Sequence, residues 1–524
     1  MPLDNAIAHQ GVHLVILHHG LWGNIGHVRF IAEQFKQRLG DRILVYRAQA
    51  NESGFTYDGV DVCGQRLVQE IYNVIKVIED GGNIEEMKGQ KSKWQKGNAK
   101  AKKAPFNDLE AEATSTTTKV TQLSYLGYSL GGLIGRFAIG ILEIDGFFDP
   151  VEQGGRGIEP MYFVTMATPH LGTRQPSRSR WSRAFNYLCA RMLSRTGEQL
   201  QLVDDYIGGK PILLVMSEPS SVFVRALTRF KRRSVYCNIR NDRSVPFWTA
   251  SFSDADPFKD LNSMEIQYNS GYSSLIESFE QQDLDDVARR KREREEALKS
   301  ASLKVRIAHR LKAIPWKKYA IFGLFGPFLL PIWLVVVSST ISVQGLNSRR
   351  RIRPIIRFNE ELQRMRDETV IMRISTIADH SETSATRQEG QPEEDEDQPR
   401  DRHYEDPTIQ SIVHVHSVPQ DTQTDSSVTL ITPPEPSGSP IKGTKPASLS
   451  YPHLKTIRQL SLLPVQIEMS KNLNQLKWRK NIIHIEALNA HASIVVRESR
   501  FSHHGGVAAV QHAVDMFKDD GEDE

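Results

Sequence analysis

Apolar positions near the start of the chain change their spacing in a regular way. Val12 to His18 and Arg42 to Tyr46 are short, nearly continuous apolar runs, which are typical of parallel strands buried on both faces. Gly26 to Leu39 and Val62 to Glu79 instead repeat their apolar residues at intervals of three and four, the spacing of a helix with one buried face. The pattern predicts two strands, each followed or preceded by a helix.

The same alternation continues beyond a Lys-rich interruption. Further strands are predicted at Val120 to Tyr128, Met161 to Met166 and Ser234 to Ile239, with a helix at Gly131 to Ile144. A last strand and helix are predicted much later, at Ile482 to Leu488 and Gly506 to Phe517. Strands that alternate with helices in this way form mostly parallel sheets covered on both faces. The sequence therefore predicts an α/β fold with a doubly wound, mostly parallel sheet.

Composition shifts divide this pattern into four segments. We expect 1–260 to form the first part of the α/β core, with a surface insertion at 81–119, and 453–524 to complete that core. Between them, 261–377 combines a charged helix with an apolar stretch. Residues 378–452 are rich in Pro, Ser, Thr, Gln and acids, a composition that predicts a disordered linker.

The apolar stretch at 319–348 contains no charged residue. A straight helix of this length would be about 45 Å long, against roughly 30 Å of bilayer hydrocarbon. Basic residues flank both ends, and Pro327 and Pro331 divide the stretch into two short arms. We expect a membrane-associated hairpin in one leaflet or in a droplet monolayer. A buried core helix and an acyl-binding cap are the alternatives.

The overall charge does little to change this picture. Lys and Arg number 66 against 63 Asp and Glu, a net charge of +3, which gives no reason to expect a nucleic-acid partner. The basic runs at 88–103 and 289–294 lack the interleaved aromatics of nucleic-acid sites, apart from Trp94. We interpret both runs as solvated faces or as contacts for anionic lipid headgroups.

Three cysteines at positions 63, 189 and 237 form no paired framework and no CxxC motif. This favours a reducing compartment, and we expect neither a metal nor another cofactor. The first ten residues show no basic segment followed by an apolar one, so no signal peptide is predicted. We expect the folded part to face the cytosol.

The predicted strand ending at Tyr128 leads into Gly127-Tyr128-Ser129-Leu130-Gly131 and then into a predicted helix. A serine needs a neighbouring base to become nucleophilic, and a sharp strand-to-helix turn exposes it to substrate. Gly127 and Gly131 allow such a turn, which makes Ser129 the candidate nucleophile. A glycine-rich helix start with an inert serine is the alternative.

A serine nucleophile also requires two backbone amides that stabilise the oxyanion of the tetrahedral intermediate. Leu130 follows the nucleophile and is the first candidate. The turn after the first strand, His19-Gly20-Leu21-Trp22-Gly23, stands where the second donor is expected, so Leu21 is the other. An ordinary tight turn is the alternative. His19 and Gly20 are candidates for the walls of the pocket.

In α/β proteins with a serine nucleophile on a strand-to-helix turn, the acid typically follows the nucleophile in the chain and the histidine comes last. Asp242 comes directly after the strand at Ser234 to Ile239 and is the favoured acid, with rivals at Asp204, Asp205 and Asp256. His491 comes just after the last strand and is the favoured base. Its alternatives are His484, which we expect to be packed, His503 and His504. His170 precedes the acid, so we expect it to shape the pocket.

Taken together, these motifs resemble the putative serine esterase family of fungal lipases and phospholipases, which includes lipid-droplet phospholipases and monoacylglycerol lipases. The resemblance rests on HHGLWGN at 18–24, YDGVDVCGQRL at 57–67, GYSLGGLIGRFA at 127–138, MATPHLGT at 166–173, NDRSVPFWTA at 241–250, DPF at 256–258 and AHASIVVR at 490–497. It covers roughly half of the chain. It implies an α/β-hydrolase fold, hydrolysis of acyl esters in glycerolipids, and a triad of Ser129, Asp242 and His491.

The sequence thus predicts a serine-dependent lipid ester hydrolase, with a phospholipase favoured over a monoacylglycerol lipase. The expected partners are a lipid substrate and the surface of a membrane or lipid droplet, and no protein partner is indicated. The expected location is the cytosolic side of lipid droplets or of the endoplasmic reticulum. An interaction protein of a different class, with a catalytically silent hydrolase fold tethered to a membrane, is the alternative.

Overall fold

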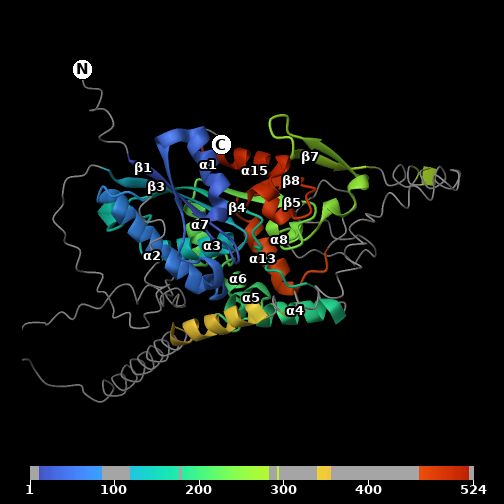
Figure 1. Ribbon diagram of the computed structural model, residues 1–524, viewed down its shortest axis with the longest axis horizontal. Coiled ribbons are helices and arrows are strands. Elements are labelled where there is room, and N and C mark those ends of the chain that lie inside the picture. The colour runs from blue at the N-terminus through green and yellow to red at the C-terminus, as the bar shows by residue number, and fades with distance from the viewer. Residues whose placement is uncertain are drawn as a thin grey trace, which may run out of the picture.

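The computed structural model describes most of the two predicted core segments and one helix between them (Figure 1). The described residues are 11–84, 118–175, 180–282, 339–355 and 460–518, with single positions at 289, 292, 293 and 335. Most of the Lys-rich insertion, the linker at 378–452, and the charged helix and first two thirds of the apolar stretch lie outside the described residues, apart from those single positions.

One eight-stranded sheet forms the centre of the described part, in the order β2-β1-β3-β4-β5-β8-β7-β6. The first six strands in this order run parallel, whereas β7 is antiparallel to both β8 and β6. The strands are β1 (Val12–His18), β2 (Ile43–Arg47), β3 (Val120–Tyr128), β4 (Glu159–Met166), β5 (Arg232–Asn238), β6 (Met264–Tyr268), β7 (Leu275–Gln281) and β8 (Arg479–Ile483).

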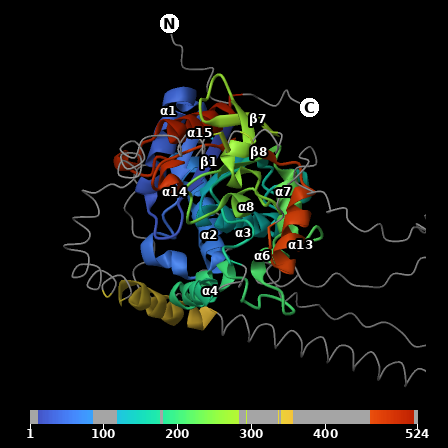
Figure 2. The ribbon, with the colours of Figure 1, turned by 90° about the vertical axis from the view of Figure 1, so that its right-hand side faces the viewer.

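Helices cover both faces of the sheet (Figures 1 and 2). The α-helices are α1 (Arg29–Leu39), α2 (Val60–Glu79), α3 (Leu130–Ile144), α4 (Arg180–Met192), α5 (Ser194–Leu200), α6 (Ile212–Val215), α7 (Val222–Arg229), α8 (Phe247–Ala250), α13 (Pro464–Asn474), α14 (Ala490–Ser493) and α15 (His504–Asp515). Short 3-10 helices are η1 (Ile25–Val28), η2 (Gly40–Arg42), η3 (Ser53–Tyr57), η4 (Val151–Gln153), η5 (Pro257–Lys259), η6 (Leu261–Ser263) and η7 (Ser499–Phe501).

The two faces have separate apolar cores. On one face α2, α3, α7 and α13 pack against the sheet, and on the other α1, α14 and α15 do so. Phe517, near the end of the described chain, lies in the second core. Its ring centroid is 4.8 Å from that of Phe35 on α1 and 4.4 Å from that of Tyr162 on β4. The last part of the chain is therefore built into the same folded body as the first.

The predicted mostly parallel α/β sheet is confirmed, and β1 and β3 have the bounds that the apolar runs predict. The sheet extends further than expected. The antiparallel pair β6 and β7 reaches Gln281, beyond the boundary placed at 260. Four of the five residues of β6 are at least partly exposed, so this edge strand lacks the apolar run that marks the buried strands.

Of the apolar stretch for which a membrane hairpin is predicted, the structure describes the end, and the hairpin itself stays a prediction. Residues 339–355 are helical and lie beside α4 in both views (Figures 1 and 2). Gly345, Ser348 and Ile352, spaced as on one face of a helix, are buried against the folded body. One face of this helix therefore packs on the protein, whereas most of its other side chains are at least partly exposed. Among the described residues, no helix combines the length and the apolar character needed to cross a membrane.

Packing between the two ends of the chain gives a first prediction. We expect Phe517→Ala to lower the free energy of unfolding by about 3–5 kcal/mol, because it removes a buried ring and leaves a cavity between α1 and β4. Chemical denaturation followed by tryptophan fluorescence measures this change. The control Leu488→Ala, at a side chain that is 86% exposed, should stay within about 0.5 kcal/mol of the wild type. Equal stability of the two variants would contradict this account of the core.

Candidate active site

Ser129 stands on the turn between β3 and α3, with a backbone φ of 56°. Its amide donates to the carbonyl of Met166 at the end of β4, which fixes the turn against the neighbouring strand. The two glycines of the motif are required by close contacts. A Cβ on Gly127 would lie 2.6 Å from Gly132 Cα, and one on Gly131 would lie 2.6 Å from the carbonyl oxygens of His18 and His19. The strained serine therefore depends on glycine at both positions.

Three residues that are far apart in the sequence form one chain of hydrogen bonds at this turn. His491 Nε2 lies 3.0 Å from Ser129 Oγ, and His491 Nδ1 lies 2.9 Å from Asp242 Oδ2. Both distances are within the range of a nucleophile, its base and the acid that orients the base. The structure thus brings together the three residues that the sequence favoured for these roles.

Asp242 lies in the loop after β5 and its side chain is 1% exposed. Its Oδ1 accepts hydrogen bonds from the amides of Ser244 and Val245, at 3.0 and 2.8 Å. The preceding residue, Asn241, has a φ of 58°, which folds the loop into a tight turn. One carboxylate oxygen is therefore held by the backbone while the other faces His491.

His491 lies on the short helix α14, shortly after β8, and its side chain is 12% exposed. Tyr128 supports it from the nucleophile's own strand. The Tyr128 hydroxyl donates to the His491 carbonyl at 2.9 Å, and the two ring centroids are 5.1 Å apart. Burial raises the pKa of Tyr128, so this hydroxyl keeps its proton and remains a donor. The sequence did not predict this role of Tyr128. The position of Tyr128 directly before Ser129 was the signal that could have indicated it.

The rival histidines and acids have other partners, and the ring centroid of His504 lies 4.2 Å from that of His503. His484 Nδ1 lies 2.6 Å from the Tyr268 hydroxyl, and His503 Nδ1 accepts from the Gly505 amide at the start of α15. The rival acids accept hydrogen bonds from backbone amides of nearby turns: Asp204 from Ile212, Asp205 from Gly209, and Asp256 from Phe258. None of these recorded contacts connects a rival to Ser129.

The turn after β1 packs directly on the nucleophile. A Cβ on Gly20 would lie 2.6 Å from Ser129 Cβ, so only glycine fits there. Leu21 is the next residue of this turn, and Leu130 begins α3 directly after Ser129. Their backbone amides thus belong to the two segments that adjoin the nucleophile, as expected of an oxyanion hole.

A loop before α2 supports this turn. The Trp22 amide donates to Thr56 Oγ1 at 3.1 Å, and Trp22 Nε1 donates to the Tyr57 hydroxyl at 2.6 Å. Trp22 has a φ of 55°, so these bonds hold a conformation that a free chain seldom adopts. The second motif of the resemblance, at 57–67, begins at this support.

His18 and His19 are fully buried beneath the turn. Burial lowers the pKa of His18 to about 4, although a hydrogen bond from its Nδ1 to the His19 carbonyl opposes the shift. Burial also lowers the pKa of His19 well below its ordinary value, and His18 adds to the effect. Both rings are therefore neutral near pH 7. They support the backbone of the turn and add no charge to the site.

His170 is fully buried and contacts β4 and α3. Its Nε2 is 3.0 Å from Thr165 Oγ1 and its Nδ1 is 3.4 Å from Arg136 Nη1 on α3. Burial and, to a smaller extent, Arg136 lower the pKa of His170 well below its ordinary value. These contacts are those of a neutral group inside the core. They do not place His170 against a substrate.

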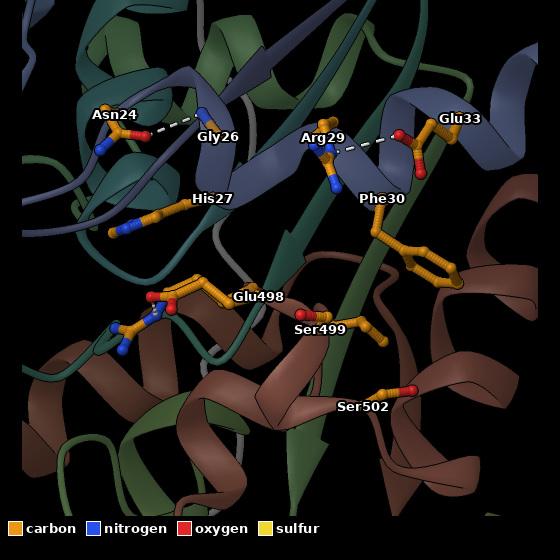
Figure 3. Close-up of a pocket in the computed structure, with 11 residues that line it drawn as sticks. Asn24, Gly26, His27, Arg29, Phe30, Glu33, Glu498, Ser499 and Ser502 are labelled. Atoms are coloured by element: carbon orange, nitrogen blue, oxygen red, sulfur yellow. Dashed lines mark hydrogen bonds and ion pairs between the residues drawn. The ribbon is translucent and has the colours of Figure 1, made fainter.

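A surface groove of about 610 Å³ lies between the start of α1 and the loop after α14 (Figure 3). It is lined by Asn24, Gly26, His27, Arg29, Phe30, Glu33, Val496, Arg497, Glu498, Ser499 and Ser502. Four of these residues are charged, two of each sign, and Arg29 pairs with Glu33 at 3.2 Å. Ser129 is not among the lining residues, so the groove is not lined by the nucleophile.

Fold and site together define an α/β protein with a Ser–His–Asp triad. A sequence model of the family described as putative serine esterase (DUF676) matches residues 8–88 and 106–255. This part of the chain is similar to that family, which confirms the resemblance inferred from the motifs.

Named relatives come from two yeasts. The chain is 30% identical over 281 residues to "Putative lipase ROG1" of Saccharomyces cerevisiae, an alignment that covers 53% of this chain and 34% of that protein. It is 26% identical over 247 residues to "Putative lipase C4A8.10" of Schizosaccharomyces pombe, covering 46% and 26%. The matches thus span about a third or less of the relatives' length.

The acid provides a second prediction. Asp242→Asn should lower kcat for a soluble short-chain ester by about 10³-fold or more, because the amide no longer stabilises the protonated His491. Steady-state hydrolysis measures the loss. Asp205→Asn, which alters an acid with no recorded contact to the triad, should keep wild-type activity. Comparable loss in both variants would contradict the assignment of the acid.

The turn over the nucleophile provides a third prediction. Gly20→Ala should reduce kcat by about 10²-fold, because its Cβ would push the turn, and with it the Leu21 amide, away from Ser129. The matched control is Gly271→Ala, where a Cβ has room at 3.4 Å from its nearest neighbour. Full activity of Gly20→Ala would show that the turn does not contribute to catalysis.

Proposed function

We propose that this protein hydrolyses acyl esters of glycerolipids, with phospholipids as the favoured substrates. The observation that supports the proposal most strongly is the hydrogen-bonded chain from Ser129 Oγ through His491 to Asp242 Oδ2. The family of putative serine esterases supports the same reaction class, and the relatives are named putative lipases. A silent hydrolase fold is disfavoured because all three positions of the triad are filled at bonding distance.

The proposed reaction follows from the geometry of the site. Ser129 Oγ attacks the acyl carbonyl while His491 Nε2 takes its proton, and Asp242 stabilises the charged imidazole that results. The Leu21 and Leu130 amides donate to the oxyanion. His491 then gives its proton to the leaving alcohol, and the acyl group stays on the serine. Water, activated by the same histidine, releases the fatty acid and restores Ser129.

We further propose that this reaction takes place on the cytosolic side of a membrane or lipid droplet, including the endoplasmic reticulum. The folded body limits how the chain can meet lipid. Ser129 and Asp242 precede the charge-free stretch at 319–348 and His491 follows it, yet the three side chains are bonded to one another. Any contact of that stretch with lipid must therefore begin and end on the same side of the membrane.

Lipid profiling of the full-length protein tests the proposed activity. Wild-type protein should release fatty acid from phospholipids in a panel that also includes mono-, di- and triacylglycerols. Ser129→Ala should lose at least about 10³-fold in rate, since the nucleophile is gone. Ser502→Ala, which alters an exposed serine of the groove, should match the wild type.

Three outcomes would decide against parts of the proposal. A Ser129→Ala variant as active as the wild type would overturn the nucleophile. Release from monoacylglycerol alone would replace the phospholipase by a monoacylglycerol lipase. Absence of labelling by a fluorophosphonate probe, under conditions that label a control lipase, would favour the silent tether.

A further inference from the structure

The helix at 339–355 and α4 form one amphipathic platform on the folded body. They meet where a Cβ on Gly345 would lie 3.0 Å from the Met192 carbonyl oxygen, and where Arg349 Nη2 donates to the Arg191 carbonyl at 3.1 Å. Figures 1 and 2 both show them next to one another at the lower edge of the molecule. We use the word platform for residues 180–192 and 339–355.

Large apolar side chains are exposed on this platform. Tyr187 and Leu188 on α4 are 64% and 55% exposed, and Val343 and Leu346 on the second helix are 53% and 54% exposed. These four belong to the eleven exposed large apolar side chains in the described part of the chain. A concentration of this kind on two adjoining helices indicates a surface that is covered in use.

The charges of the platform have one sign. Residues 180–192 and 339–355 contain seven arginines and no Asp or Glu. Five of the arginines are exposed beside the apolar side chains: Arg180, Arg183, Arg191, Arg350 and Arg353. Apolar side chains among basic ones, without acids, are the composition of helices that lie on anionic lipid. The second helix also contains the last part, 339–348, of the charge-free stretch that begins at 319.

The platform is fixed to the loop that supports the active site. Arg351 Nη2 donates to Asp58 Oδ1 and to the Gly54 carbonyl, both at 2.8 Å. On the α4 side, Arg195 of α5 pairs with Asp61 of α2 at 2.5 Å. Residues 54–58 lie in the loop before α2. Thr56 and Tyr57 of this loop hold Trp22, a residue of the turn after β1. The platform and the catalytic turn therefore share one support.

We propose that the platform is the surface by which this protein docks on anionic lipid, with Tyr187, Leu188, Val343 and Leu346 entering the headgroup region and the exposed arginines pairing with phosphates. Docking through the platform presents the active site to the lipid in a fixed orientation, because the platform and the turn after β1 are both attached to the 54–58 loop. This inference rests on the proposed lipid hydrolysis, which gives the docking its purpose. The protein can nevertheless bind lipid without hydrolysing it.

Vesicle co-sedimentation of full-length Ser129→Ala protein tests the docking without consuming lipid. The protein should bind vesicles of phosphatidylcholine mixed with phosphatidylserine more tightly than vesicles of phosphatidylcholine alone, and added salt should weaken the binding. Adding Val343→Ser and Leu346→Ser should reduce the affinity roughly tenfold. Adding Arg350→Gln and Arg353→Gln instead should reduce it roughly 25-fold, about fivefold for each charge.

Two matched controls keep the result specific to the platform. Val151→Ser removes a 55% exposed valine on η4, and Lys36→Gln removes an exposed positive charge on α1, and neither should change vesicle binding. In protein with Ser129 intact, all platform variants should still hydrolyse a soluble short-chain ester at the wild-type rate. This readout also shows that the variants fold.

The outcomes separate the docking surface from the proposed activity. Equal binding to the two kinds of vesicle, or unchanged binding of both platform variants, would overturn the docking surface even if ester hydrolysis persists. Selective binding that the platform variants lose would support it even if the wild type hydrolyses no ester, in which case the proposed function fails alone. Capture of an acidic protein, with no binding to anionic vesicles, would also overturn the proposal.

Discussion

The pairing of β5 with β8 is the interaction on which the site depends. Five residue pairs from Ser234–Arg479 to Asn238–Ile483 align the two strands in parallel. Asp242 follows the first strand and His491 the second, so both loops leave the sheet at its carboxyl edge, where the nucleophile's turn also lies. Asn238 locks the register at this edge, because its side chain accepts from the Ile485 amide at 2.8 Å. Without this pairing, no shared backbone structure would hold Asp242 and His491 at a fixed distance from each other.

The same pairing explains how so long an interruption is tolerated. The chain leaves the sheet after β7 and re-enters it at β8, which begins at Arg479, and β7 itself pairs with β8. The last strand before the interruption and the first strand after it thus lie side by side in one sheet. Lengthening a loop adds closure entropy only slowly, so an insertion at such a point costs little stability.

The sequence predicted secondary structure correctly where a strand is buried on both faces. β1 and β3 are buried on both faces and their apolar runs match the strand bounds, and the glycines around Ser129 marked the sharp turn. Arg351 shows why the rest was not predictable. Beside a charge-free stretch, a run of arginines favours a membrane flank, yet Arg351 pairs with Asp58 some 293 residues earlier. A contact of that range is set by tertiary packing and leaves no local periodicity.

Asp58 also shows how a helix can be added to a core without the core depending on it. Its fully buried carboxylate accepts from Arg66, which is 6% exposed, as well as from the more exposed Arg351. A buried ion that loses its partner costs roughly 3–5 kcal/mol, so Asp58 and Arg66 require each other. Arg351 is different, because Asp58 keeps Arg66 when the second guanidinium leaves and Arg351 itself can return to water. The helix at 339–355 therefore binds to a carboxylate that already has a buried partner within the core.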